Sequence, residues 1–98
     1  MGDLVLPLKR EYFEAIRDGS KPEEFRLANE YWRKRLVGRN YDRIVLTLGY
    51  PSRYDTERRI VRPWRGYTEK TITHPHFGSS PVQVFAINVE AAKSRKGE

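Results

Sequence analysis

GSKPEEFR, residues 19–26, marks a change from helix to strand. From Lys9 to Asp18 the apolar residues recur at helical spacing, and Gly19 is typical of a left-handed helix C-cap. Pro22 suits the first position of a strand, where its missing amide hydrogen costs least, and it pushes Lys21 into an extended conformation. The stretch therefore predicts a helix, a tight turn and the start of a strand.

The strand after this turn carries charge on one of its two faces. Phe25 and Leu27 share one face while Glu24 and Arg26 share the other, which is typical of a half-buried strand. Strand parity places Lys21 on the opposite side unless the turn redirects it. Two interpretations stay open: a solvated network of ion pairs worth less than about 1 kcal/mol each, or a Lys-Glu-Arg cluster that serves a polar ligand.

The rest of the sequence predicts one more helix and mostly strands. Asn29 is placed to cap the second helix, and the strand at 42–48 is apolar on both faces, so we expect it to be central. Six strands and two short helices near the N-terminus predict an α+β fold with a small closed or nearly closed β-barrel. The predicted elements are a strand at Leu4–Leu8, helices at Lys9–Asp18 and Glu30–Val37, a strand following Lys21, and strands at Asp42–Leu48, Glu57–Trp64, Tyr67–Thr73 and Val82–Val89.

Composition points to one basic domain. Ninety-eight residues, 38% of them hydrophobic, suffice for a single core, which we place at residues 1–90, with a basic, disordered tail at 91–98. The net charge is +6 and thirteen of the 19 cationic residues are arginine, a bias that favours nucleic acid or another phosphate-bearing partner.

The absence of cysteine excludes disulfides, thiol nucleophiles and cysteine-ligated zinc. Without a signal pattern or a membrane-spanning apolar run, we expect a cytoplasmic protein with no membrane partner.

Aromatic and arginine residues are interleaved at three places: 31–33, 50–54 and 63–67. Such patterns suit single-stranded RNA, because bases stack on exposed rings while guanidinium groups follow the backbone. The spacing of Trp32 with Leu36 indicates a core residue instead. The better candidates for RNA contact are Tyr50, Arg53, Tyr54 and Arg65.

Two histidines flank a proline in the loop at 74–81. His74 and His76 fall short of the three or four ligands that zinc requires, so we expect neither a metal nor a cofactor. We expect these two side chains to serve loop structure or RNA contact.

The spacing Gly-x-Lys-x-x-Glu-x-Arg at residues 19–26 resembles the signature of the ASCH family, in the PUA-like superfamily. The resemblance extends to Leu6-Pro7-Leu8 and to the closing strand at 84–89. It implies a PUA-like β-barrel at residues 1–90 of five to six mixed strands, with a basic cleft that receives RNA or a nucleotide. It also implies that Lys21 and Arg26 contact phosphate or an anionic substrate, and that Glu24 orients them or accepts a proton.

Some ASCH relatives are hydrolases, which gives an alternative function. One group hydrolyses N4-acetylcytidine with a lysine, a threonine and a distant glutamate; here the lysine matches Lys21, Glu24 stands at the threonine position, and Glu57 and Glu69 are candidates for the glutamate. Another group cuts single-stranded RNA, for which Lys21, Glu24 and a tyrosine or histidine supply a cation and a base. An adaptor that contacts protein through its aromatic patches is a third interpretation.

Overall fold

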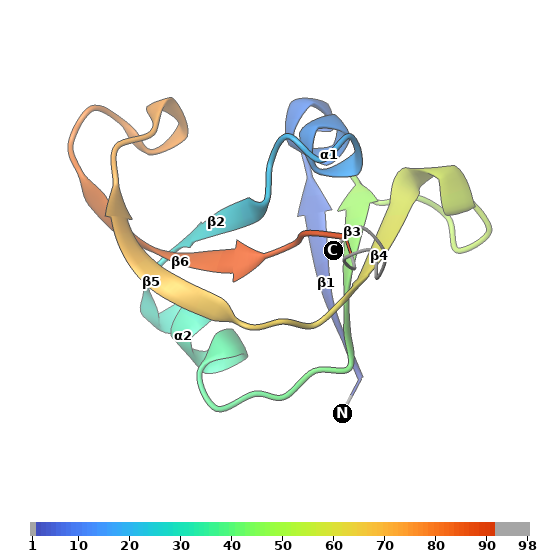
Figure 1. Ribbon diagram of the computed structural model, residues 1–98, viewed down its shortest axis with the longest axis horizontal. Helices are drawn as coiled ribbons and strands as arrows, with labels where there is room; N and C mark the ends of the chain where they lie inside the picture. Colours follow the sequence, from blue (N-terminus) through green and yellow to red (C-terminus); the bar gives the residue numbers. More distant parts are fainter. Residues whose placement is uncertain (1, 92–98) are drawn as a thin grey trace, which may run out of the picture.

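The computed structural model describes residues 2–91, with the exception of the His76 side chain. These residues form six strands, two α-helices and two short 3-10 helices (Figure 1). No helix in this part of the chain is long and apolar enough to cross a membrane. The basic tail predicted at 91–98 lies outside the described residues, apart from Ala91. In order, the elements are β1 (Asp3–Leu8), α1 (Arg10–Arg17), β2 (Glu23–Leu27), α2 (Glu30–Leu36), β3 (Arg43–Leu48), β4 (Arg59–Pro63), β5 (Tyr67–Ile72) and β6 (Val82–Asn88).

The first sheet has the strand order β1-β3-β4. β3 pairs parallel to β1 and antiparallel to β4, so the prediction that this strand is central is confirmed. A parallel neighbour requires a long connection, and the chain between β1 and β3 contains α1, β2 and α2. Leu4 pairs with Ile44 and Leu6 with Leu46, and all four side chains are buried on one face of the sheet.

The second sheet has the order β2-β6-β5, with both neighbours antiparallel to β6. Residues 84–87 of β6 are buried throughout, as expected for a central strand that is covered on both faces. β5 is largely exposed and forms one edge of this sheet, while β2 forms the other.

The predicted closed or nearly closed β-barrel is wrong, because the strands of residues 2–91 pair only within two separate three-stranded sheets. β4 and β5 follow each other closely in the sequence, yet each belongs to a different sheet. The connector between them adopts a positive φ at Gly66 (84°) and is bonded to both sheets: Trp64 N donates to Asp42 O, and Asn88 N donates to Gly66 O. The chain therefore changes sheet at this point instead of forming a hairpin.

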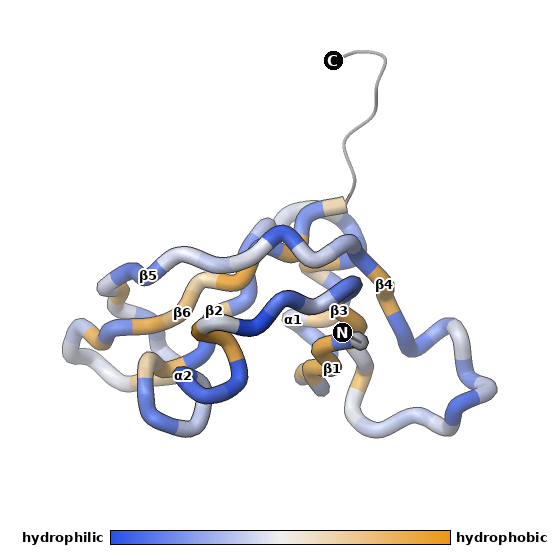
Figure 2. Tube along the Cα trace, turned by 90° about the horizontal axis from the view of Figure 1, so that it is seen from below, coloured by the Kyte–Doolittle hydropathy of each residue, from blue (hydrophilic) through white to orange (hydrophobic). Residues whose placement is uncertain are grey.

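One apolar core fills the space between the inner faces of the two sheets and α1. Figure 2 shows apolar residues concentrated along β1, β3 and β6. α1 contributes Phe13 and Ile16, and α2 contributes Leu36. Two short 3-10 helices were not predicted: one at Thr56–Arg58 replaces the start of the strand predicted from Glu57, and one at Pro75–Phe77 lies in the loop after β5.

Candidate functional site

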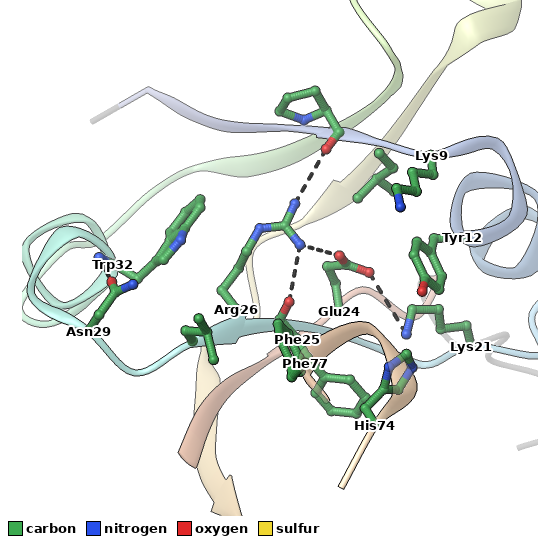
Figure 3. A pocket seen from close by; sticks show the side chains of 13 residues that line it. Lys9, Tyr12, Lys21, Glu24, Phe25, Arg26, Asn29, Trp32, His74 and Phe77 are labelled. Atoms are coloured by element: carbon green, nitrogen blue, oxygen red, sulfur yellow. Dashed lines mark hydrogen bonds and ion pairs between the residues drawn. The ribbon is translucent and has the colours of Figure 1, made fainter. Parts of the chain in front are cut away.

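A cavity of about 370 Å³, here called the pocket, opens between the two sheets (Figure 3). Its lining comes from five places in the chain: the end of β1, α1, the turn before β2 with β2 itself, the start of α2, and the 3-10 helix after β5. Segments from residue 7 to residue 77 therefore build one site.

The charged face of β2 is the face that points into the molecule. Glu24 pairs with Ile87 and Arg26 with Phe85, and both partners on β6 belong to the buried core. Directly opposed residues of an antiparallel pair point to the same side, so Glu24 and Arg26 face inward. Leu27 is 38% exposed on the other face. Apolar and charged residues alternate along β2 as predicted, and the side chains that face the interior are the charged ones.

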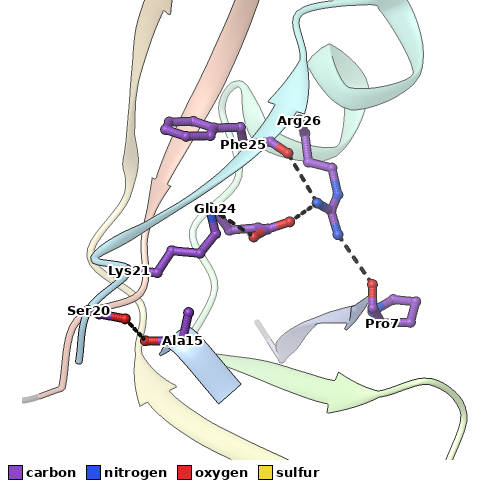
Figure 4. Close-up of polar contacts among 7 residues, drawn as sticks. All are labelled: Pro7, Ala15, Ser20, Lys21, Glu24, Phe25 and Arg26. Atoms are coloured by element: carbon purple, nitrogen blue, oxygen red, sulfur yellow. Dashed lines mark hydrogen bonds and ion pairs between the residues drawn. The ribbon is translucent and has the colours of Figure 1, made fainter. Parts of the chain in front are cut away.

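Arg26 holds Glu24 in place and links the two sheets (Figure 4). One guanidinium nitrogen, Nη1, donates to Oε2 of Glu24 and, at 3.1 Å, to the carbonyl oxygen of Phe25. The other, Nη2, donates to the carbonyl oxygen of Pro7 on β1, at 3.4 Å. Several donors of this guanidinium are therefore directed at protein acceptors.

Lys21 joins the same cluster. Its Nζ lies 3.8 Å from Oε1 of Glu24, and in Figure 3 it approaches Glu24 from the side opposite Arg26. Its backbone amide donates to the carbonyl oxygen of Ala15 at 3.0 Å, which anchors the turn to α1. The turn at Pro22 thus redirects the lysine into the site, against simple strand parity.

One oxygen of Glu24 has no hydrogen-bond partner. Glu24 is only 5% exposed, and its Oε1 is buried without a donor within hydrogen-bond distance. The 3.8 Å to Lys21 Nζ is an ion pair too long to count as a hydrogen bond. A buried acceptor without a hydrogen bond costs about 1–3 kcal/mol, so this oxygen would be stabilised by any donor that reaches it.

Aromatic rings form the walls of the pocket. Lys21 Nζ lies 5.2 Å from the ring centroid of Tyr12 and 4.7 Å from that of Phe25. The His74 ring packs against the rings of Tyr12, Phe25 and Phe77, with centroids 5.9–6.4 Å apart. Burial, together with the charges of Glu11 and Glu24, raises the pKa of the Tyr12 phenol above its usual value. The raised pKa favours the uncharged form of this phenol.

Trp32, on α2, forms another wall of the pocket. The cap of this helix is as predicted, with Asn29 Oδ1 accepting from the backbone amide of Trp32 at 3.0 Å. Trp32 is only partly buried: it packs against the core and also lines the pocket, where the Arg26 guanidinium carbon lies 5.3 Å from its ring centroid. Its interpretation as a core residue was therefore incomplete.

The structure brings together four of the candidate site residues predicted from the sequence: Lys21, Glu24, Arg26 and His74. The other candidates whose side chains are described do not line the pocket. Tyr50 and Tyr54 are 90% and 80% exposed in the segment between β3 and β4, which lies at the opposite end of the molecule from α2 in Figures 1 and 2. The candidates away from the pocket are Tyr50, Arg53, Tyr54, Arg65, Glu57 and Glu69.

Sequence reasoning missed the contribution of both helices to the site. Tyr12 shares a helical stripe with Ile16, and that spacing indicates core packing rather than a pocket wall. The sequence did contain one indication: a tyrosine on an otherwise apolar helix face needs a polar environment for its hydroxyl group. Lys9 and Asn29 line the pocket only because the starts of α1 and α2 flank β2, which the sequence pattern does not reveal.

Metal ligation has no support in the described side chains, among which no group of three or more His, Asp or Glu residues is placed to hold an ion. The predicted contact at His76 lies outside the described side chains. No family model, curated protein or solved structure matches this chain.

Proposed function

We propose that this chain is an ASCH-type domain that binds RNA or a nucleotide by receiving one base in the pocket beside Glu24. The observation that carries the proposal is the buried Oε1 of Glu24, an acceptor without a donor in a cavity with aromatic walls. Every nucleobase presents N–H groups on its edge, and in the proposed complex one of them reaches this buried oxygen as the neighbouring Lys21 side chain moves aside.

The size and walls of the pocket suit a single base. At about 370 Å³ it lies near the lower end of the range for small-molecule sites, about 300–1,000 Å³. Tyr12, Phe25 and Trp32 offer ring faces or edges against which a planar base packs. A base can enter such a site only when it is unstacked, which favours a single strand over a duplex.

The polar groups divide into base-directed and phosphate-directed sets. Glu24 Oε1 accepts from the base, and Lys21 Nζ, 3.8 Å away, donates to a neighbouring acceptor on the same edge. Lys9 is exposed at the rim and attracts phosphate. The contacts of Arg26 with Glu24, Phe25 and Pro7 favour a positioning role for this residue over the phosphate contact that the ASCH resemblance implies.

The decisive variant is Glu24→Gln. Arg26 has only donors to offer, so it selects the amide orientation that turns the glutamine oxygen towards it, and the NH₂ group then takes the place of Oε1. The acceptor beside Lys21 therefore becomes a donor. We expect affinity for the base to fall about tenfold or more.

Intrinsic fluorescence gives the measurement. The chain has two tryptophans, and Trp64 packs against Tyr41 away from the pocket, so Trp64→Phe leaves Trp32 as the only reporter. The four nucleoside 5′-monophosphates and a short single-stranded RNA are titrated at two salt concentrations, and affinity for the RNA is expected to fall with salt. The matched control is Glu23→Gln, the neighbouring carboxylate that pairs with Lys70 on the surface. Equal effects of Glu24→Gln and Glu23→Gln, or no saturable binding, would contradict the proposal.

Hydrolysis of RNA or of a modified nucleoside is a second candidate, favoured by the closeness of Lys21 Nζ to the free oxygen of Glu24. In this scheme Glu24 takes a proton from the attacking hydroxyl or water and returns it to the leaving oxygen or nitrogen as the P–O or C–N bond breaks, while Lys21 stabilises the negative charge that develops on phosphate or carbonyl oxygen.

The test for hydrolysis is product formation from labelled single-stranded RNA and, separately, from N4-acetylcytidine. Lys21→Met should abolish it while the circular dichroism spectrum is retained. If both substrates stay intact under conditions where they bind, hydrolysis is excluded and the binding function stands.

A further inference from the structure

A series of aromatic and guanidinium groups leads from the pocket onto the surface of α2. Within the pocket, the Trp32 ring is approached by Arg26, and the guanidinium carbon of Arg35 lies 5.9 Å from the same ring centroid. Arg35 also lies 4.5 Å from the ring centroid of Tyr31, and the rings of Tyr31 and Trp32 meet edge to face at 5.1 Å. We call Tyr31, Trp32 and Arg35 the α2 ladder.

The outer members of the α2 ladder are accessible. Tyr31 is 56% exposed, and Arg35, four residues further along the same helix face, is also exposed. Among the described residues, no carboxylate lies within ion-pair distance of Arg35. Lys34, three residues after Tyr31, adds a second positive charge on this side of the helix. An exposed ring next to an uncompensated guanidinium is suited to a base and the phosphate attached to it.

We infer that the true ligand is a single strand of nucleic acid rather than a free nucleotide. One base occupies the pocket, the phosphate that follows it contacts Arg35, and the neighbouring base stacks on Tyr31. This inference rests on the proposed function, because the pocket fixes the first base. It adds a second subsite and excludes duplexes, since the two bases are held by separate walls.

The second subsite can be tested separately from the pocket by comparing ligands of one and of three nucleotides. Isothermal titration calorimetry compares each nucleoside 5′-monophosphate with the corresponding trinucleotide of RNA. We expect wild-type protein to bind the trinucleotide about tenfold more tightly, which corresponds to one stacked base. Tyr31→Ala and Arg35→Ala should each remove most of that gain and leave the affinity for the monophosphate unchanged. Arg35→Lys should restore part of it, because the charge remains while the planar fork of donors is lost.

The chain supplies a matched control on another surface. Arg53 and Tyr54 form the same kind of pair, with the guanidinium carbon 5.3 Å from the ring centroid. They belong to the segment between β3 and β4, which lies at the other end of the molecule from α2 in Figure 1. Replacing both by alanine removes one ring and one positive charge, so any effect of composition or net charge alone appears here too. We expect this double variant to keep the full gain from ligand length.

Three outcomes would overturn the inference: equal affinity for monophosphate and trinucleotide, a gain that survives both α2 variants, or a gain that disappears in the Arg53/Tyr54 variant instead. Alanine is the strongest helix former, so the α2 variants should fold, and an unchanged far-UV circular dichroism spectrum verifies it. Failure of the proposed function looks different, because then the monophosphates do not bind or bind equally well to Glu24→Gln. If no ligand of either length binds, both proposals are wrong.

Discussion

At the scale of single residues, two ion pairs on neighbouring positions of β2 differ in where they lie. Glu23 pairs with Lys70 at 2.6 Å on the exposed face, and Glu24 pairs with Arg26 on the buried face. Exposed pairs contribute little, since water screens both charges. A buried pair is different, because removing one partner leaves a desolvated charge without compensation.

This contrast gives the first stability prediction. Arg26→Ala should lower the free energy of unfolding by about 3 kcal/mol, because Glu24 would keep only the more distant Lys21 and the contact with Pro7 on β1 would be lost. Lys70→Ala should lower it by less than about 1 kcal/mol. Urea denaturation followed by circular dichroism measures both. Equal losses would show that the Glu24–Arg26 pair is as well solvated as the surface pair.

At the scale of secondary structure, α2 is short and depends on its cap. Helices of two turns are marginal alone, so the Asn29 side chain, which satisfies the amide of Trp32, and the buried Leu36 hold this element in place. Because the α2 ladder lies on this helix, fraying of α2 should also weaken binding at the proposed second subsite.

Asn29→Ala should therefore have two effects. Stability should fall by about 1 kcal/mol, the usual cost of losing an N-cap, and the gain in affinity from a trinucleotide should shrink because α2 frays at Tyr31. Asn29→Ser keeps a capping oxygen and should preserve both properties. Denaturation and calorimetry on the same two variants check this prediction. If stability falls while the affinity gain from a trinucleotide is kept, the order of α2 does not affect the proposed second subsite.

At the scale of the whole molecule, the two sheets are joined by side chains as well as by the core. Arg62 on β4 donates through Nε to Val89 O, just after β6, at 3.1 Å, and through Nη2 to Ile16 O of α1 at 3.3 Å. One guanidinium thus connects the first sheet, the end of the second sheet and the last turn of α1.

Arg62→Ala should cost about 2 kcal/mol of unfolding free energy, since two carbonyl groups lose a charged donor. Arg62→Lys should recover only part, because an ammonium group lacks the fork needed to reach both carbonyls. Arg58→Ala is the control: Arg58 pairs with Asp55 on the surface at 3.3 Å, and its loss should cost less than about 1 kcal/mol. Similar losses for Arg62→Ala and Arg58→Ala would mean that Arg62 does not hold the sheets together.

The sequence by itself determined the local structure of this protein. Helical spacing with Gly19 and Asn29 at the right places, and alternation in the strands, gave every main element within a few residues, because these signals depend on neighbours along the chain. It also identified Lys21, Glu24 and Arg26 as a possible cluster, which the structure brings together.

Tertiary structure decided which strands pair and which face of each is buried. The sequence does not fix that β4 and β5 join different sheets, and so the predicted barrel was wrong. Nor does alternation say which side of β2 faces inward; its pairing with Phe85 and Ile87 on β6 turns the charged side into the molecule. Tyr12 and Trp32 become pocket walls, and Tyr50 and Tyr54 lie far from them, for the same physical reason: long-range packing places residues that local patterns cannot relate.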